Sequence, residues 1–455
     1  MELNPEIFRE YDIRGIVDKD LDASTFELLG KAYVAYMKGK TKYNCAVVGR
    51  DGRLTGREYA HAAIDGITSC GMNVVDIGEV PSPVMYYALN TVKDVDGGLM
   101  LTASHNPKEY NGSKVAVGKT TIYGEEISKL YGIAKAGKFP VAKKPVTITK
   151  MNVVPDYQKR IVRGIKLKRK LRVVVDAANG VGGVVAVPIF EQLGCEVIPL
   201  YCEVDGNFPN HHADPTKKEN LKDLIRLVKK YKADVGIGFD GDVDRLGGCD
   251  EQGNMLTGDR LLALFARSIL KDKPGSVILG EVKCSRGLYE DVAKHGGKPI
   301  MWRTGHSHIK AAMIEKHAQL AGEMSGHIFF KHRWYGFDDA IYSAARLLEL
   351  LAAEKKPLSA HLSSIPERPV TPEIEFNCAD NKKFKVIEEA TKFFQGQGYD
   401  VVTIDGARIE FPDGWGLLRA SNTSPKLVMR VEADTAKRVK EIRAIIENKV
   451  KELNG

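Results

Sequence analysis

The sequence predicts an α/β protein with several domains. Four short β-branched runs are each followed by a glycine-rich turn and a helical pattern, which is typical of βα units. These runs, CAVVGRDGR, LRVVVDAANG, ADVGIGFDGD and SVILGEVKCS, begin at residues 45, 171, 233 and 276. A chain of 455 residues is also too long for one hydrophobic core. We therefore expect largely parallel or mixed sheets, distributed over more than one domain.

Domain boundaries are indicated where proline and lysine collect, at residues 143–155 and 366–372. A further break is expected near residues 250–254. After Pro372 the pattern changes to two or three strands and a final helix, which predicts a separate α+β domain. We expect four domains, over residues 1–150, 151–253, 254–366 and 367–455.

The final helix is predicted from a cap and an apolar face. Asp434 and Thr435 can cap its first turn. Apolar residues then recur at helical spacing. The residues of this face are Val439, Ile442, Ile446, Val450 and Leu453.

The composition, with 43% hydrophobic and 28% charged residues, is that of an ordinary globular protein. A formal net charge of +8 is compatible with a nucleic-acid or membrane-surface partner. However, the densest basic run, residues 216–232, has apolar residues at helical spacing, so its lysines form a solvated helix face. We expect a small anionic substrate, with neither nucleic acid nor membrane as a partner.

The seven cysteines are scattered and lack C-x-x-C spacing. This pattern favours a reducing compartment without structural zinc. No stretch approaches the ~18 apolar residues of a spanning helix, and the first residues lack a signal-peptide pattern. We expect a cytoplasmic protein.

Ser104 and His105 follow a predicted buried strand at residues 98–102, and Asn106-Pro107 then ends regular structure. Taken alone, this segment is an ordinary turn in which a serine bonds its own backbone. The turn is the better interpretation of this segment by itself, although it leaves open why a hydroxyl and an imidazole stand at the end of a strand.

Asp240, Asp242 and Asp244 alternate directly after the strand-like VGIGF. Three convergent carboxylates are costly unless a cation compensates them, which favours a divalent metal. A dinucleotide loop fails because a pyrophosphate would meet this acidic cluster. A calcium loop would need glycine where Arg245 stands, and a solvated acidic turn is the remaining alternative. With phosphate nearby, Mg²⁺ fits better than calcium.

Two further loops can bind oxygen-rich ligands. RASNTSP, residues 419–425, combines a guanidinium group with hydroxyl and amide donors. Such a loop can bind a phosphate, or it can be an ordinary polar turn. GEMSGH, residues 322–327, can bind vicinal hydroxyls and offers a histidine, although a lone loop histidine is more often structural. The basic segments FREYDIRGI at 8–16 and VGRDGR at 48–53 could equally be surface turns.

Together these segments resemble the α-D-phosphohexomutase superfamily. The resemblance rests on YDIRG, TASHNP, DGDVDR, GEMSGH and RASNTSP, which occur in this order from residue 11 to residue 425. It implies four domains around a central cleft, three of them related α/β domains with mixed sheets. It also implies transfer of a phosphoryl group between the 1- and 6-positions of a hexose through a phosphoserine and a hexose 1,6-bisphosphate. The GEMSGH form is most similar to that of bacterial members acting on both mannose and glucose phosphates.

The resemblance implies a role for each matching residue. It identifies Ser104 as the phosphoserine and a metal ligand, together with Asp240, Asp242 and Asp244. Catalytic residues around the phosphoryl group would be Arg14, Lys114, Arg245, His306 and His327, with Lys114 or His327 as the acid/base. Substrate-binding residues would be Tyr11, Lys283, Glu323, Ser325, Arg419, Ser421, Asn422 and Thr423.

We expect the protein to be a Mg²⁺-dependent isomerase of sugar phosphates, activated by glucose or mannose 1,6-bisphosphate. We expect it to be a monomer and to supply precursors of nucleotide sugars. A phosphoglucosamine mutase or a glucose-specific phosphoglucomutase is the near alternative. A metal-dependent phosphatase or a calcium-binding module is the alternative from another class. One departure from the family pattern is Val243, where a smaller residue is usual. We expect its side chain to point away from the ion.

Overall fold

The computed structural model describes residues 3–40, 42–421 and 425–454, and they form four β-sheets. The chain divides into two compact units. Unit 1 comprises residues 1–261 and 325–362, and unit 2 comprises residues 262–324 and 363–455. Each unit contains two of the sheets, except that one short strand of a unit 2 sheet, β15, belongs to unit 1.

The first sheet of unit 1 has the order β1-β5-β4-β2-β3-β7, and β6 pairs with β5. Strands β2, β3, β4 and β7 run parallel, whereas β1 and β5 are antiparallel to their neighbours. The sheet is therefore mixed, as expected. Its strands are β1 (Ile13–Ile16), β2 (Cys45–Arg50), β3 (Asn73–Glu79), β4 (Gly97–Leu101), β5 (Tyr110–Val117), β6 (Thr120–Thr121) and β7 (Ile148–Lys150).

The predicted strand before Ser104 is β4, and all of its residues are buried. Gly98 lies so close to β2 that a Cβ there would approach the Val47 carbonyl oxygen to 2.1 Å. Among the described residues, six helices belong to this part of the chain, and in α1 the Asp22 carboxylate caps the first turn by accepting a hydrogen bond from Thr25 N. The helices are η1 (Pro5–Ile7), α1 (Ala23–Met37), α2 (Gly56–Ser69), α3 (Ser82–Thr91), α4 (Glu125–Ala136) and α5 (Val154–Gly164).

The second sheet of unit 1 has the order β11-β10-β8-β9 and is also mixed, because β11 runs antiparallel to β10. The predicted basic helix begins as η2 and continues as α7, with Leu221, Leu224 and Val228 buried. Its lysines are exposed or half-buried. The elements are β8 (Arg172–Asp176), α6 (Gly183–Gln192), β9 (Glu196–Leu200), η2 (Lys218–Leu221), α7 (Lys222–Tyr231), β10 (Val235–Phe239) and β11 (Leu246–Asp250).

A short strand and two helices from residues 325–362 complete unit 1: β15 (Ile328–Phe330), α11 (Ala340–Ala353) and α12 (Leu358–Leu362). Asp339 caps α11 by accepting a hydrogen bond from Tyr342 N at 2.8 Å. The Tyr157 hydroxyl and the Trp334 indole donate to the same carboxylate. Asp339 therefore ties three segments of unit 1 together from a fully buried position.

Unit 2 begins within α8 (Gly258–Asp272) and contains the parallel strands β13-β12-β14. Because parallel strands need crossover connections, helices α9 and α10 alternate with them. The elements are β12 (Val277–Glu281), α9 (Arg286–Lys294), β13 (Lys298–Trp302), α10 (His306–Glu315) and β14 (Leu320–Gly322).

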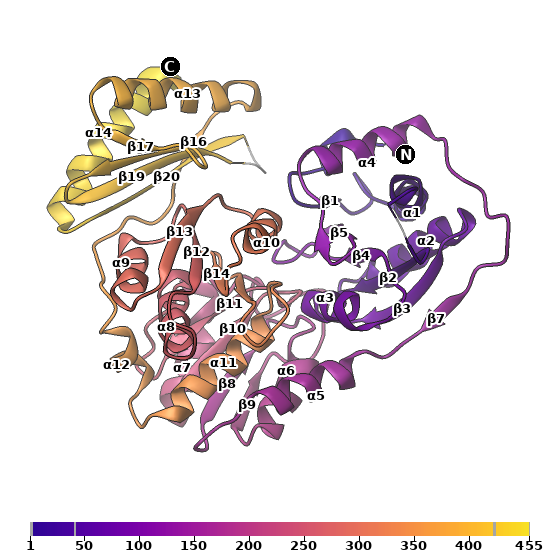
Figure 1. Ribbon diagram of the computed structural model, residues 1–455, viewed down its shortest axis with the longest axis horizontal. Helices are drawn as coiled ribbons and strands as arrows, with labels where there is room; N and C mark the ends of the chain where they lie inside the picture. The colour runs from indigo at the N-terminus through magenta and orange to yellow at the C-terminus, as the bar shows by residue number, and fades with distance from the viewer. Residues whose placement is uncertain (1–2, 41, 422–424, 455) are drawn as a thin grey trace. The chain divides into compact units, whose positions relative to one another are not determined.

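The C-terminal part of unit 2 is an antiparallel sheet, β16-β20-β19-β18-β17, that packs against α13 and α14 (Figure 1). The predicted final helix is α14, and four of the five expected face residues are fully buried, with Leu453 packed beside them. Thr435 caps it by accepting from Arg438 N. The elements are β16 (Ile374–Asn377), α13 (Asp380–Gly396), β17 (Asp400–Val402), β18 (Ala407–Phe411), β19 (Gly414–Ala420), β20 (Lys426–Ala433) and α14 (Ala436–Asn454).

The predicted fold class is thus confirmed, with mixed α/β sheets followed by a C-terminal α+β part. The four residue ranges expected for the domains stay a prediction. Among the helices of the described residues, none is long and apolar enough to cross a bilayer.

Asp339 is expected to make stability depend on pH. Burial raises the pKa of its carboxyl to about 7 in the folded protein, against about 3.9 when unfolded. The stabilisation is therefore complete below pH ~4 and is lost as the pH rises through about 7. Asp339→Asn removes this dependence. Denaturation at several pH values measures the free energy of unfolding. Across this window that of wild type should fall by about 1.4 kcal/mol per pH unit relative to that of the variant. A difference in free energy of unfolding that does not change with pH, as expected for the exposed Asp65→Asn, contradicts the assignment.

Candidate functional site

Ser104 lies just beyond the carboxyl end of β4, in the loop that leads to β5. It is only 3% exposed. Its backbone adopts a left-handed conformation, with φ of +50°, which is uncommon for a residue with a side chain. Ser104 N donates to Thr102 Oγ1 at 2.8 Å, so the loop is held by its own side chains. The turn predicted from Asn106-Pro107 is present: Asn106 N donates to Ala103 O.

The three aspartates occupy the loop between β10 and β11, and all are buried. Ser104 Oγ donates to Asp240 Oδ2 at 2.8 Å, so the serine faces the acidic loop. Carboxylate oxygens of Asp240, Asp242 and Asp244 all lie within 4.8 Å of one another. Val243, between the last two, has φ of +69° and is fully buried, so the loop curls here.

Lys114, on β5, compensates part of this negative charge. Its Nζ donates to Asp242 Oδ2 at 2.6 Å and also contacts Asp244 Oδ2. Burial opposes its charge, but the two carboxylates raise the pKa of Lys114 well above its usual range. Burial and repulsion from the other two aspartates raise the pKa of Asp240 well above its usual range. The loop is therefore short of positive charge.

Two carboxylate oxygens are left for a cation. Asp242 Oδ1 and Asp244 Oδ1 are buried and make no hydrogen bond with the described residues. Buried oxygens of this kind are costly unless they bind something. Because Lys114 occupies the other oxygen of each carboxylate, these acidic residues form a possible metal site.

Arg245 belongs to the acidic loop, and His327 lies next to it. Arg245 Nε donates to His327 Nε2 at 3.2 Å, and its guanidinium lies 3.9 Å from Asp240. His327 Nδ1 lies 3.2 Å from Asp338 Oδ2 and 3.6 Å from Asp244 Oδ1. The histidine is thus oriented by two carboxylates, one of which belongs to the acidic loop.

Arg14 and His105 flank the serine. Arg14, on β1, donates to Asn106 Oδ1 at 2.7 Å and pairs with Asp12. His105 Nδ1 lies 3.3 Å from Ser104 Oγ. Burial, and then the charges of Arg245 and Arg14, lower the pKa of His105 well below its usual range. His105 is therefore a neutral neighbour of the serine. Tyr11 is half-buried in the loop before β1.

In unit 2 the predicted residues follow the carboxyl ends of three parallel strands. Lys283 follows β12, His306 follows β13 and Glu323 follows β14. All three strand ends share one edge of the sheet, where open α/β sheets bind ligands. Burial opposes the charge of Lys283, but Glu281 and Glu373 raise its pKa. The Glu323 carboxylate accepts a hydrogen bond from Gly305 N.

Arg419 ends β19 in the same unit and pairs with Asp405, with Nη2 3.1 Å from Oδ2. The Asp405 carboxylate also accepts from Thr304 N, which joins the C-terminal sheet to the loop after β13. Ser421 is buried, and its carbonyl accepts from Lys383 Nζ at 2.6 Å. Asn422 and Thr423 lie outside the described residues. Ser325 belongs to unit 1, with His327.

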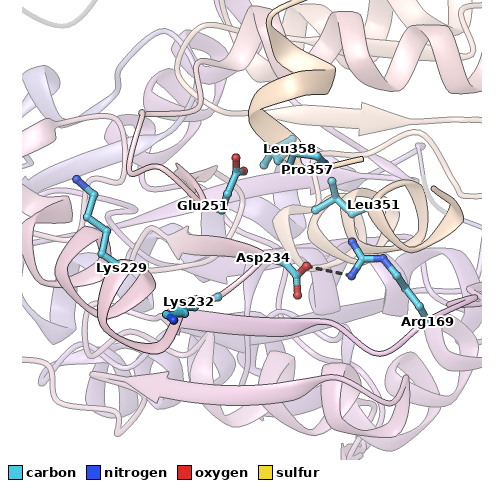
Figure 2. A pocket seen from close by; sticks show the side chains of 9 residues that line it. Arg169, Lys229, Lys232, Asp234, Glu251, Leu351, Pro357 and Leu358 are labelled. Atoms are coloured by element: carbon cyan, nitrogen blue, oxygen red, sulfur yellow. Dashed lines mark hydrogen bonds and ion pairs between the residues drawn. The ribbon is translucent and has the colours of Figure 1, made fainter. Parts of the chain in front are cut away.

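Figure 2 shows a pocket of about 360 Å³ in unit 1 that contains none of the predicted site residues. Its charges are of both signs, and Arg169 donates to Asp234 at 3.0 Å within it. The rest of its wall includes apolar side chains such as Leu351 and Leu358. No group in this lining is arranged for a reaction. The candidate site is therefore the set of loops at the carboxyl ends of the strands, described above.

Four family models match the chain in order. They describe phosphoglucomutase/phosphomannomutase alpha/beta/alpha domains I, II and III, at residues 5–140, 155–253 and 257–368, and the C-terminal domain at residues 373–449. The chain belongs to the phosphoglucomutase/phosphomannomutase family.

Relatives match along nearly their whole lengths. A phosphomannomutase/phosphoglucomutase of Pseudomonas aeruginosa is 46% identical over 453 residues, 100% of this chain and 97% of the relative. A phosphoglucomutase of Neisseria gonorrhoeae is 45% identical over 450 residues, 97% of each. The solved structure of a phosphoglucomutase/phosphomannomutase family protein from Burkholderia thailandensis has a TM-score of 0.94 and 43% identity, covering 99% of this chain and 98% of that one.

The structure also brings to the site residues that the sequence alone did not select. Asp338 lies beside His327, Ser82 donates to Asp242, and Glu281 accepts from Met324 N. Each acts through contacts between distant segments, so no local pattern indicated it. The sequence left Arg53 open between a site residue and a surface turn residue, and the surface alternative is wrong: its side chain is buried against the Ser104 loop.

Removing the positive charge of Lys114 is expected to destabilise unit 1. Lys114→Met leaves two buried carboxylates without their cation, which costs about 3–5 kcal/mol. Lys119→Met, at an exposed position a few residues along, is the control. Urea denaturation measures both. Equal midpoints for the two variants would show that Lys114 does not balance the acidic loop.

Proposed function

We propose that this chain is a phosphohexomutase that interconverts the 1- and 6-phosphates of mannose and glucose. The observation that carries the proposal is the contact of Ser104 Oγ with Asp240 Oδ2, at the edge of an acidic loop with two unsatisfied carboxylate oxygens. The relatives are named for mannose and glucose, at nearly equal identities, which favours a substrate range that includes both sugars.

Ser104 is the proposed phosphate carrier. A sugar hydroxyl attacks the phosphorus of phosphorylated Ser104, the P–Oγ bond breaks, and the sugar becomes a 1,6-bisphosphate. The hydroxyl proton passes to an acid/base on the protein, for which Lys114 and His327 are the candidates. Burial opposes the charge of Lys114, but Asp242 and Asp244 hold its pKa well above the usual range and keep it protonated. We therefore favour His327. After the bisphosphate turns round, Ser104 Oγ attacks its other phosphate and releases the isomeric monophosphate. Each turnover therefore restores the phosphoserine.

Asp240, Asp242 and Asp244 are the proposed ligands of Mg²⁺, with the Ser104 phosphate. Hard carboxylate oxygens suit this ion, which keeps free positions for phosphate and water. The buried Oδ1 atoms of Asp242 and Asp244 fit it, because Lys114 contacts the other oxygen of each carboxylate and neither Oδ1 makes a hydrogen bond with the described residues. When bound, Mg²⁺ supplies charge stabilisation for the transferring phosphoryl group.

The positively charged side chains of unit 1 balance the remaining charge. A phosphoserine carries about −1.5 to −2 at pH 7, and three buried aspartates already surround it. Arg245 lies beside Asp240, and Arg14 reaches the loop at Asn106. Phosphoryl transfer depends mainly on such positioning and charge stabilisation. We assign Arg14, Lys114 and Arg245 to this role.

The groups of unit 2 are the proposed recognition elements. Glu323, with Ser325 of unit 1, holds sugar hydroxyls, and Lys283 and His306 contact the substrate. Arg419, Ser421, Asn422 and Thr423 anchor the phosphate that is not reacting, which is the role suited to a guanidinium fork. Tyr11 is a further substrate contact. The four expected domains would each supply one of these groups of residues.

Replacing the carrier is expected to abolish the reaction. Ser104→Ala removes the only atom proposed to hold the phosphoryl group, so mutase activity should fall at least about 10³-fold. Intact mass after incubation with glucose 1,6-bisphosphate should show one added phosphate in wild type and none in the variant. Ser128→Ala, at an exposed serine, should behave like wild type. Turnover by Ser104→Ala at the wild-type rate would end the proposal.

The acidic loop is expected to bind Mg²⁺. Removal of divalent cations with a chelator should stop turnover, and Mg²⁺ should restore it. Asp240→Asn should lower the apparent Mg²⁺ affinity at least about 10-fold, read from the Mg²⁺-dependent rise of the thermal midpoint as well as from activity. Asp65→Asn on the surface of α2 serves as the control. An unchanged Mg²⁺ response in Asp240→Asn places the ion elsewhere.

A further inference from the structure

Arg53 directs its side chain at the loop that carries Ser104. It lies just after β2 and is 4% exposed. Its guanidinium donates to four main-chain carbonyls of one segment. Nη1 donates to Pro107 O at 2.8 Å and Tyr110 O at 2.7 Å, and Nη2 donates to Ser104 O at 2.9 Å and Asn106 O at 2.6 Å.

The loop uses all four Nη hydrogens of this guanidinium. Arginine has five N–H groups, four of them on the two Nη atoms. Those four meet the four carbonyls. Nε is buried, makes no hydrogen bond with the described residues and lies 3.3 Å from Asp51 Oδ2 as an ion pair. The ring of Phe208 lies 5.4 Å from the guanidinium carbon. Arg53 therefore acts through the loop, because its Nη groups are already engaged there.

Asp51 holds the same loop from its other end. The Thr102 hydroxyl donates to Asp51 Oδ2 at 2.7 Å. Thr102 Oγ1 in turn accepts from Ser104 N at 2.8 Å. The backbone of Ser104 is thus fixed on both sides, its N–H through Thr102 and Asp51 and its carbonyl by Arg53 directly.

This restraint coincides with an unfavourable backbone conformation at Ser104. A left-handed φ of +50° costs about 1–2 kcal/mol for a residue with a side chain. Such conformations persist where surrounding contacts enforce them, often at functional sites. The contact of Ser104 Oγ with Asp240 Oδ2 at 2.8 Å depends on this conformation, because the backbone directs the side chain.

We propose that Arg53 is a positioning residue for phosphoryl transfer, which holds Ser104 in its left-handed conformation against the acidic loop. This inference rests on the proposed role of Ser104 as phosphate carrier. Lysine cannot replace Arg53, because an ammonium group has three donors and no planar fork. At least one of the four carbonyls is then left without its partner, and the loop is free to leave the reactive geometry.

The test compares Arg53→Lys, Arg53→Ala and wild type in full-length enzyme. Misplacement of a reacting atom by about 1 Å costs on the order of 10²-fold. We expect kcat to fall about 10- to 100-fold in Arg53→Lys and further in Arg53→Ala, while KM for glucose 1-phosphate stays within about twofold. Arg57→Lys, exposed on α2, should match wild type. Millimolar guanidinium should raise kcat of Arg53→Ala severalfold and leave wild type unchanged.

The outcomes separate this proposal from the proposed function. If wild type forms no phosphoserine and does not convert the sugar phosphates, the function itself is wrong. If wild type is active and Arg53→Lys keeps its kcat, the positioning role is wrong. A lower thermal midpoint with unchanged kcat in the folded enzyme also overturns it, because Arg53 would then serve stability alone. Loss of kcat with unchanged KM and rescue by guanidinium supports it.

Discussion

The rest of the site depends on the burial of three carboxylates beside one serine. Asp240, Asp242 and Asp244 are removed from water, and Lys114 pairs with the last two of them at short distance. Like charges at this separation repel strongly in a protein interior. The serine hydroxyl, a lysine and a nearby guanidinium stabilise the negative charge of the loop. Two of its carboxylate oxygens make no hydrogen bond with the described residues and can bind a cation. The same shortage of positive charge favours a divalent cation, which can bind phosphate oxygens as well as carboxylates.

The fold explains how these groups meet. In both units several of the chemical groups follow the carboxyl ends of parallel strands, where the loops of a sheet gather on one edge, whereas Arg14 and Lys114 lie on the antiparallel strands β1 and β5. In unit 1 these strands are β2, β4 and β10, which lead to Arg53, Ser104 and Asp240. In unit 2 they are β12, β13 and β14. Rigid sheets thus hold short loops whose side chains would be too mobile on a flexible segment.

Local sequence patterns predicted many of the strands, helices and site loops, but not the contacts between segments that are distant in sequence. The strand before Ser104, the strand before Asp240 and the apolar face of α14 follow from periodicity, because each depends on residues close in sequence. Family membership followed from five loops in order. The sequence could not decide the place of Arg53, because its four partners lie some 50 residues away. Asp338 was overlooked because its contact with His327 matches no short motif. The left-handed backbone of Ser104 has no sequence signal, since only its surroundings enforce it.

The central claim is that the phosphoryl group passes through Ser104. The most direct measurement mixes enzyme phosphorylated at Ser104 with glucose 1-phosphate whose phosphoryl group carries an isotopic label, for a single turnover. The account predicts that the glucose 6-phosphate formed carries the unlabelled phosphoryl group from the enzyme, and that the label appears on Ser104. Product that retains the label, or label released as inorganic phosphate, would contradict it.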